Sequence, residues 1–343
     1  MKKIIQTTAA FLSIFITLTL LSACGEKQET TGKENEDEVV LRYQQRKGVV
    51  DPVDLAADLG YLDGIRLESV GDYKGGPEDI QLTATGEIDF GYTFNGAIVK
   101  SVAKNVNIIS VIGSYGSDDQ NFVGAYALED SEIQTPKDLI GKKIGVNILG
   151  AHYEFAIIEY LRKAGLADDE IKQVELVTIP QSNAEQALRA GQLDAVVLSG
   201  PVQDVALNRG GLKQLFSDTD VFGFHFIAGS YVFRKDFVKE HPETVKKFVE
   251  GVAKAIEWSK TTPREKVIQR FEKIIKKRNP NETTEFIQYW KSYGISSKGA
   301  VLTEKDFQVW IDWLVESGEL KAGEIQARDL FTNEFNPYAQ KSN

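Results

Sequence analysis

Two stretches of the sequence decide the fold. Residues 86–97 read GEIDFGYTFNGA, and residues 191–202 read GQLDAVVLSGPV. Each stretch follows an expected helix, and its first residue is the glycine that ends that helix. Then come an aspartate (Asp89 or Asp194), a short apolar strand and a loop of small residues. The repeated unit predicts two similar α/β lobes, although a chance match between two ordinary α/β units stays open over so short a stretch.

The loops that end the two units are candidate ligand sites. Asn95-Gly96 and Gly200-Pro201 fall at matching offsets from the two aspartates. In open α/β sheets, ligands bind beyond the carboxyl ends of the strands. Two lobes that present such loops to each other would therefore enclose a cleft.

The flanking sequence continues the alternation of strands and helices, which predicts a parallel-type α/β sheet. From about Pro242 to Glu319 the spacing is amphipathic and helical, and its aromatic residues favour core packing over a ligand cage. The expected strands are 39–43, 65–70, 88–91, 107–112, 143–147, 174–179 and 194–198, and the expected helices are 52–59, 77–85, 97–104, 153–163 and 184–190.

The first 24 residues indicate the cellular compartment. Lys2 and Lys3 precede an apolar stretch over 4–21, and the sequence LSACG follows over 21–25. This arrangement is typical of a secretory signal peptide, and it resembles the bacterial lipobox, whose cysteine is acylated after cleavage. We expect a signal peptide over 1–23 and a lipid on Cys24; a single membrane-spanning anchor is the alternative.

Charge and composition narrow the classes of function. The 343 residues include 40 Lys and Arg against 50 Asp and Glu, a net charge of −10, which argues against a nucleic-acid partner. Residues 24–38 are polar and acidic, so we expect a flexible tether there. The globular part would begin near Val39 and work on the extracytoplasmic face of the cell membrane, held by the lipid.

Catalytic and metal-binding motifs are missing from the sequence. It contains no phosphate-binding glycine loop and no Gly-x-Ser-x-Gly elbow. His152, His225 and His241 are widely spaced and Cys24 is the only cysteine, which excludes a paired zinc motif and an intrachain disulfide. We therefore expect a protein that is not an enzyme and that needs no cofactor or metal.

Six short motifs stand out along the chain: LRYQ (41–44), DLGY (58–61), GEIDFG (86–91), DLIGKKIGV (138–146), EQALR (185–189) and AKAIEW (253–258). Taken in this order, they resemble one family, the substrate-binding proteins of ABC importers for nitrate, taurine and aliphatic sulfonates. That family also includes binders of the pyrimidine precursor of thiamine. The resemblance covers about residues 39–335, and the absence of the cysteine-rich motif of the thiamine-pyrimidine synthases argues against a synthase.

The resemblance implies a two-lobed periplasmic-binding-protein fold of type II, with a ligand cleft between the lobes and a helical C-terminal region. Lobe 1 would comprise 39–124 plus 229–343 and lobe 2 would comprise 125–228, with crossing segments near 122–128 and 222–231. Closure of the lobes would trap a small-molecule ligand. The closed protein, a monomer, would dock on the permease subunits of an importer driven by an ATPase.

Candidate ligand contacts lie in loops and at helix starts of both lobes. The helix that begins near His152 offers backbone N–H groups that could hold an anionic head group. Arg42 and Arg46 are the nearest guanidinium groups, but we do not expect a charged clamp. The expected ligand contacts are Gln44, Gln45, Tyr92, Asn95, Gly96, Tyr115, Ala151, His152, Tyr153, Ser199, Gly200 and His225.

The resulting hypothesis is a lipid-anchored solute-binding protein of an ABC importer. It would capture a small organic anion, an aliphatic sulfonate or a taurine-like compound. Nitrate and a thiamine-type pyrimidine are alternative ligands. A secreted enzyme and a ligand-sensing partner of a membrane receptor are alternative functions.

Overall fold

The computed structural model describes residues 38–339. The predicted signal peptide over 1–23, Cys24 and the predicted tether up to residue 37 lie outside the described residues. The strands are β1 (Val39–Gln45), β2 (Ile65–Asp72), β3 (Phe90–Phe94), β4 (Ile108–Ser117), β5 (Val123–Leu128), β6 (Lys143–Val146), β7 (Glu175–Thr178), β8 (Ala195–Ser199), β9 (Leu212–Ser217) and β10 (Phe226–Arg234).

The α-helices and short 3-10 helices (η) connect these strands and form most of the C-terminal region. The α-helices are α1 (Pro52–Asp58), α2 (Gly76–Thr85), α3 (Asn95–Ala103), α4 (His152–Lys163), α5 (Asp168–Ile171), α6 (Gln181–Arg189), α7 (Gly200–Asn208), α8 (Asp218–Phe222), α9 (Lys235–Glu240), α10 (Pro242–Thr261), α11 (Arg264–Arg278) and α12 (Lys305–Glu316). The 3-10 helices are η1 (Pro136–Leu139), η2 (Ile287–Tyr289), η3 (Lys298–Ala300) and η4 (Ala327–Asp329).

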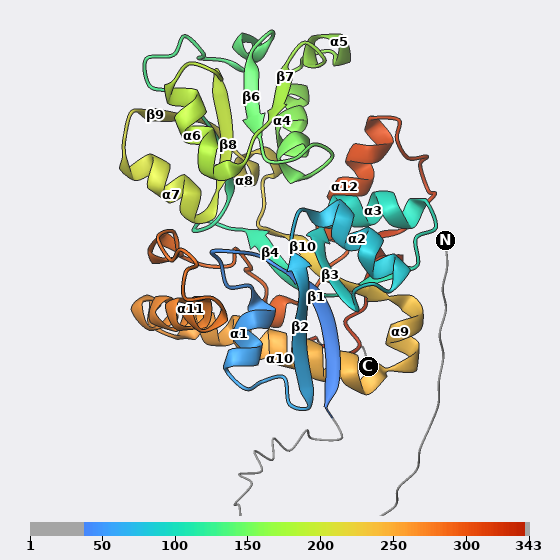
Figure 1. The fold of residues 1–343 in the computed structure, drawn as a ribbon. Helices are drawn as coiled ribbons and strands as arrows, with labels where there is room; N and C mark the ends of the chain where they lie inside the picture. Colours follow the sequence, from blue (N-terminus) through green and yellow to red (C-terminus); the bar gives the residue numbers. More distant parts are fainter. Residues whose placement is uncertain (1–37, 340–343) are drawn as a thin grey trace, which may run out of the picture. The chain divides into compact units, whose positions relative to one another are not determined.

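Three sheets organise these elements into two lobes. In lobe 1, β1 pairs in parallel with β2, while β10 lies between β3 and β4 and is antiparallel to both. In lobe 2, five strands follow the order β7-β6-β8-β5-β9. Figure 1 shows the lobe 2 sheet with α4, α6 and α7 in the upper part of the view, and the lobe 1 sheets with α1, α10 and α11 below. The predicted two-lobed α/β fold is confirmed.

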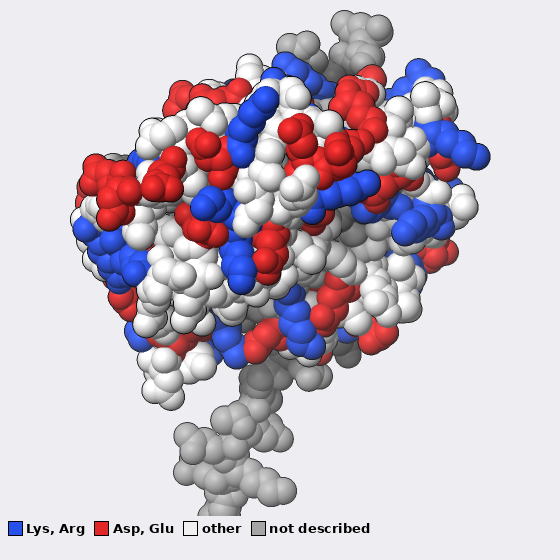
Figure 2. Space-filling view, turned by 90° about the horizontal axis from the view of Figure 1, so that it is seen from above, with Lys and Arg blue, Asp and Glu red and all other residues white. Residues whose placement is uncertain are grey.

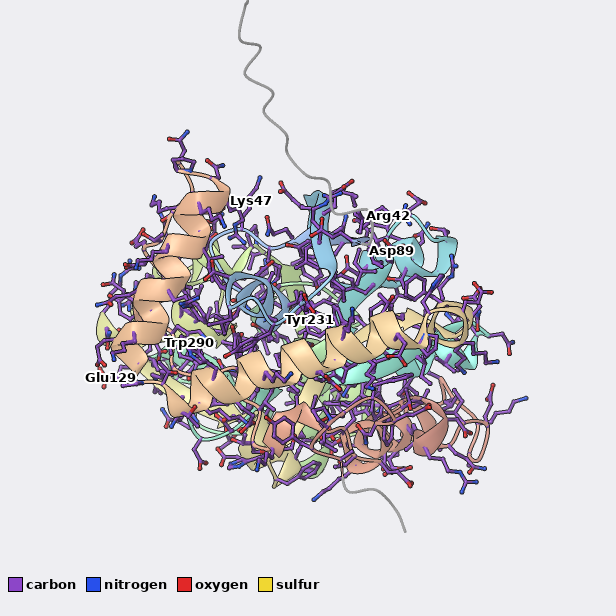
Figure 3. All side chains as sticks on the ribbon, turned by 90° about the horizontal axis from the view of Figure 1, so that it is seen from below. Arg42, Lys47, Asp89, Glu129, Tyr231 and Trp290 are labelled. Atoms are coloured by element: carbon purple, nitrogen blue, oxygen red, sulfur yellow. The ribbon has the colours of Figure 1, made fainter. Side chains whose placement is uncertain are left out.

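The repeated sequence unit has the same hydrogen bonds in both lobes. The Asp89 amide donates to the Arg42 carbonyl of β1, and the Asp194 amide donates to the Lys143 carbonyl of β6, each at 2.9 Å. The carboxylates accept in return from the Arg42 amide at 2.7 Å and the Lys143 amide at 2.8 Å. Figure 3 shows Arg42 and Asp89 side by side. Each aspartate thus fixes the start of the strand that follows it.

The sheets are mixed, which corrects the parallel-type sheet predicted from the alternation of strands and helices. The chain passes from lobe 1 to lobe 2 between Ser117 and Val123 and returns between Phe222 and Phe226. Both strands that follow a crossing, β5 and β10, pair antiparallel with their neighbours because each enters its sheet from the opposite lobe. The first crossing therefore precedes the expected segment near 122–128, which forms β5.

The helical C-terminal region is less continuous than its spacing predicts. Helix α10 ends just before Pro263 and α11 ends just before Pro280, where proline removes the amide that would continue the helix. Between Asn279 and Glu304 the chain forms only the short turns η2 and η3, so the helical expectation is wrong there. The aromatic residues of the region pack as expected: Phe248 and Phe271 have no exposed surface.

Aromatic packing joins the two lobes along one side. Phe155 of α4 stacks on Trp313 of α12, with ring centroids 3.8 Å apart. Phe155 also packs edge-on against Trp310 of the same helix, with ring centroids 5.7 Å apart. Burial of a large apolar side chain contributes about 1.5–3 kcal/mol, so this seam between α4 and α12 holds one side of the cleft together.

Candidate ligand-binding site

Three tyrosines of lobe 1 gather where its strands face lobe 2. Tyr92 projects from β3 and Tyr115 from β4, and their ring centroids are 5.4 Å apart. Tyr73, which follows β2, meets Tyr92 edge-on at 5.5 Å. These half-buried rings form an aromatic wall, and such a wall suits the face of a planar ligand.

Arg46 lies beside this wall. Its guanidinium carbon is 4.9 Å from the centroid of the Tyr92 ring. The guanidinium also holds Asp51 with two nitrogens, Nη2 at 2.6 Å and Nε at 3.1 Å from the carboxylate oxygens. Asp51 is only 7 % exposed. The positive charge of Arg46 is therefore matched by a carboxylate within the site.

Lobe 2 contributes Tyr153 and Ser199 to the same cleft. The Tyr153 hydroxyl and Ser199 Oγ are 2.7 Å apart. Tyr153 lies in the first turn of α4, and Ser199 precedes the first residue of α7. Burial raises the pKa of Tyr115 well above its ordinary value, and the neighbouring hydroxyls of Tyr92, Tyr73 and Tyr153 raise it further. Tyr153 of lobe 2 therefore lies near enough to Tyr115 of lobe 1 to affect its pKa.

A small cavity of about 10 Å³ lies under the aromatic wall of lobe 1. Asp79, in the first turn of α2, is 1 % exposed, and its Oδ2 accepts from the Tyr92 amide at 2.9 Å. Burial raises the pKa of Asp79 to about 8, although the Tyr92 amide acts in the opposite direction. The cavity is lined by Tyr43, Gln44, Arg46, Asp51, Val53, Tyr73, Asp79, Phe90, Tyr92 and Tyr231.

Three predicted ligand contacts lie in the core instead. Asn95 has no exposed surface; its Nδ2 donates to the Ile227 carbonyl at 2.8 Å, and its Oδ1 accepts from Ser230 Oγ at 2.7 Å. A Cβ on Gly96 would meet the Phe94 ring at 2.5 Å. These two residues are corrected from ligand contacts to packing residues, because β3 runs directly into α3 and buries the turn between them.

His152 is the third of these corrections. It is 4 % exposed, and its ring stacks on Phe94 with centroids 5.3 Å apart. Its Nε2 lies 2.9 Å from Oδ2 of Asp218, a fully buried carboxylate that also accepts from Ser117 Oγ and from the Val123 amide. His152 therefore joins the buried group between the two crossings rather than the open cleft.

The other predicted contacts are scattered around the cleft. Gln45 donates to the Tyr43 hydroxyl at 2.7 Å, inside lobe 1. Ala151 precedes α4, and Gly200 begins α7 with a φ of 57°. His225 pairs with Asp119 at 3.0 Å. The structure thus brings Gln44 and Tyr92 together at the small cavity, Tyr92 together with Tyr115, and Tyr153 together with Ser199, whereas Gln45 and His225 have other partners.

Sequence reasoning missed Tyr73, Asp79 and Asp51. Asp79 follows the Gly75-Gly76-Pro77 turn that opens α2, and this placement in a first helical turn was a usable signal. Tyr73 and Asp51 lie in loops whose local sequence resembles ordinary surface. Tyr73 and Asp51 line the small cavity only because β2 and α1 lie beside the ends of β1 and β3.

A larger groove of about 650 Å³ lies beside the crossing segments. It reaches from Asp119 and His225 at the crossings to Trp290 after η2 and Lys260 in α10. Its cations already have partners: Lys260 contacts Glu257 at 2.9 Å, and Lys291 contacts Asp204 of α7 at 2.5 Å. The second pair links the two lobes at the mouth of the cleft.

Other site types find little support in residues 38–339. Within that range no group of three His, Cys, Asp or Glu side chains is placed to hold a metal ion. None of the described helices is both long enough and apolar enough to cross a bilayer. Figure 2 shows acidic and basic side chains interspersed over the visible face, without the large basic patch that nucleic acid would require.

Sequence comparison finds relatives of more than one kind. A protein of Brucella abortus named as a binding protein is 26% identical over 270 residues, covering 77% of this chain and 80% of the relative. A protein of Bacillus subtilis named as an aliphatic sulfonates-binding protein is 24% identical over 249 residues, covering 70% and 71%. The yeast 4-amino-5-hydroxymethyl-2-methylpyrimidine phosphate synthase THI5, from Saccharomyces cerevisiae, is 24% identical over 301 residues, covering 84% and 83%.

Comparison with solved structures supports the fold described above. The periplasmic aliphatic sulphonate binding protein SsuA of Escherichia coli superposes with a TM-score of 0.63 at 18% identity, covering 85% of this chain and 91% of SsuA. The chain therefore has the periplasmic-binding-protein fold that the motifs imply. The family described as NMT1/THI5 like matches residues 51–266. Because this match spans more than half of the chain, the protein belongs to the NMT1/THI5-like family.

Proposed function

We propose that this protein is the extracytoplasmic substrate-binding protein of an ABC importer, and that it holds a small organic ligand between its lobes. Three observations support the proposal: the contact of Tyr92 with Tyr115 in lobe 1, the contact of Tyr153 with Ser199 in lobe 2, and the effect of Tyr153 on the pKa of Tyr115. A site assembled from both lobes is completed only when they close. Ligand binding and closure are then one coupled event.

The charges in the cleft favour a neutral, planar ligand. Arg46 is neutralised by Asp51, and burial raises the pKa of Asp79 to about 8, so Asp79 adds little charge at neutral pH. A sulfonate bound here would compete with Asp51 for the guanidinium, and the displaced carboxylate would lose its partner while buried. A planar ring packed on Tyr92 and Tyr115 needs no such exchange. A pyrimidine-type ring, one of the alternatives named from the sequence, therefore fits this cleft better than the aliphatic sulfonate.

The aliphatic sulfonate remains the second candidate because of two observations. The Bacillus subtilis relative carries that ligand in its name. The side chain of Arg46 is 33 % exposed, so its guanidinium is accessible to an anion. In this alternative, Arg46 would exchange Asp51 for the ligand as the lobes close.

The cellular setting of the proposal follows from the N-terminal sequence. Cleavage before Cys24 and acylation of that cysteine would leave residues 24–38 as a tether on the outer face of the cell membrane. The two lobes, 39–124 plus 229–343 and 125–228, would move about the crossings. A monomer would deliver its ligand to the permease and ATPase subunits.

Binding without turnover distinguishes this proposal from an enzyme of the same family, such as the yeast synthase. Residues 25–343 would be screened by thermal shift against pyrimidines, alkyl sulfonates, taurine and nitrate. A ligand at one hundred times its dissociation constant stabilises the folded state by about 2.7 kcal/mol, which corresponds to a rise of several degrees.

Two controls accompany the screen. Each hit is incubated with the protein and analysed for product by mass spectrometry; stoichiometric binding with unchanged ligand supports a binding protein, and turnover refutes it. The variant Tyr92→Ala should lose the response to a ring compound, whereas Tyr289→Ala, a substitution of the same type outside the cleft, should keep it.

A further inference from the structure

Two buried oxygen atoms in the small cavity of lobe 1 have no hydrogen-bond partner. They are Oδ1 of Asp79 and Oε1 of Gln44, and both residues line that cavity. The other oxygen of Asp79 is occupied by the Tyr92 amide at 2.9 Å. The amide nitrogen of Gln44 is occupied by Glu78 Oε1 at 3.1 Å, and this bond fixes which end of the side chain faces the cavity.

Such atoms are costly in a folded protein. A buried acceptor without a donor loses its hydration, at about 1–3 kcal/mol per group, and most buried polar groups therefore have partners. The nearby cation does not relieve this cost, because Arg46 is held by Asp51 through two nitrogens. An N–H donor from a third group would pair both oxygens, and it would favour the ionised form of Asp79 over the protonated form that burial favours.

The cavity also limits the size of that group. Its volume of about 10 Å³ accommodates roughly one small polar group and excludes a ring. The rings of Tyr73 and Tyr92 form part of the same lining. A ligand ring packed on this wall would therefore direct only a substituent downwards, between Asp79 and Gln44.

We propose that Asp79 and Gln44 form an acceptor subsite, which receives the N–H donors of an amino or amidine substituent on the ligand. The inference rests on the proposed function, since it assigns one contact within the same cleft. It also makes Asp79 and Gln44 the residues that select ligands carrying such donors. A ligand with a methyl group in that place would leave both oxygens unpaired.

Matched pairs of probes test the subsite by isothermal titration with residues 25–343. The first pair is 4-amino-2-methylpyrimidine and 2,4-dimethylpyrimidine, and the second is taurine and propane-1-sulfonate. Within each pair an amino group replaces a methyl group of similar size. We expect the amino compound of at least one pair to bind about tenfold more tightly, the effect of roughly one to two hydrogen bonds.

Three variants complete the experiment. Asp79→Asn and Gln44→Leu should reduce the preference for the amino compound to less than about threefold, since each removes one acceptor. Asp72→Asn is the control: it makes the same chemical change in lobe 1 on a side chain that is 59 % exposed, and it should keep the preference. Circular dichroism of each variant verifies folding before titration.

The outcomes separate the subsite from the proposed function. Equal binding of the two members within each of the two pairs, or an unchanged preference in Asp79→Asn and Gln44→Leu, refutes the subsite while the cleft remains the binding site. Failure of every amino compound to bind more tightly than its partner, including failure to bind at all, also refutes the subsite. Binding of nitrate alone refutes both the subsite and the ring ligand.

Discussion

The substitution Asn95→Ala separates a packing role from a ligand-binding role. The sequence predicted Asn95 as a ligand contact, whereas the structure buries it completely and satisfies its amide within the protein. Its Nδ2 donates to the carbonyls of Ile227 at 2.8 Å and Asp306 at 3.3 Å, and its Oδ1 accepts from Ser230. The side chain thus links the start of α3 to β10 and α12.

The magnitude of the effect follows from these bonds. Alanine would leave a buried carbonyl and a buried hydroxyl without partners, at about 1–3 kcal/mol each, together with a small cavity. We therefore expect a loss of about 3–5 kcal/mol in the free energy of unfolding. At 2 °C or less per kcal/mol for a chain of this size, the melting temperature should fall by roughly 5–10 °C.

Urea unfolding and thermal melting of residues 25–343 measure this loss, and titration with a hit from the screen measures binding. Asn183→Ala is the matched control, because Asn183 is exposed on α6. It should change stability by less than about 0.5 kcal/mol. A variant Asn95→Ala that melts like the wild type but binds more than tenfold more weakly would refute the packing role.

Three further predictions concern the mouth of the cleft, its floor and the N-terminus. Lys291→Ala should weaken ligand binding about twofold at low salt and not at high salt, since the pair with Asp204 joins the lobes but is partly exposed; a large loss that is independent of salt would contradict this. The pKa of Asp79 is raised to about 8 in the folded state. Between about pH 4 and 8 the folded state therefore binds more protons than the unfolded state, so the free energy of unfolding should fall as pH rises through that window. Urea unfolding at pH 5 and pH 9 should show a smaller fall for Asp79→Asn, and an equal fall would exclude Asp79 as its source. Cys24→Ser should move the protein from the membrane fraction to the soluble fraction, while retention in membranes would favour the spanning anchor.

Part of the site was accessible to sequence reasoning because it depends on local order. The offsets of Asp89 and Asp194 identified two equivalent units, and both aspartates make the same backbone bonds. Tyr92 lies in the strand of the first unit, and Ser199 ends the strand of the second. A short strand followed at once by a helix is decided by nearby residues, and one sequence suffices to detect it.

The errors have a common physical origin in contacts between distant residues. Asn95 was expected in a ligand loop, but its partners Ile227 and Asp306 come from segments 132 and 211 residues away. His152 was expected at an anion site, but Phe94 and Asp218 enclose it. No local pattern indicates that a loop will be covered by a helix from the other end of the chain.

By itself, the sequence determined the α/β class, the two repeated units and the family resemblance, because each depends on residues close together along the chain. Only the tertiary structure decided which polar side chains are buried and which face the cleft. It paired Arg46 with Asp51 and left Asp79 and Gln44 with unpaired oxygens under the tyrosines. The charge balance that distinguishes a ring from a sulfonate arises from segments that meet only after the strands have paired, since electrostatic and hydrogen-bond energies depend on distance in space rather than along the chain.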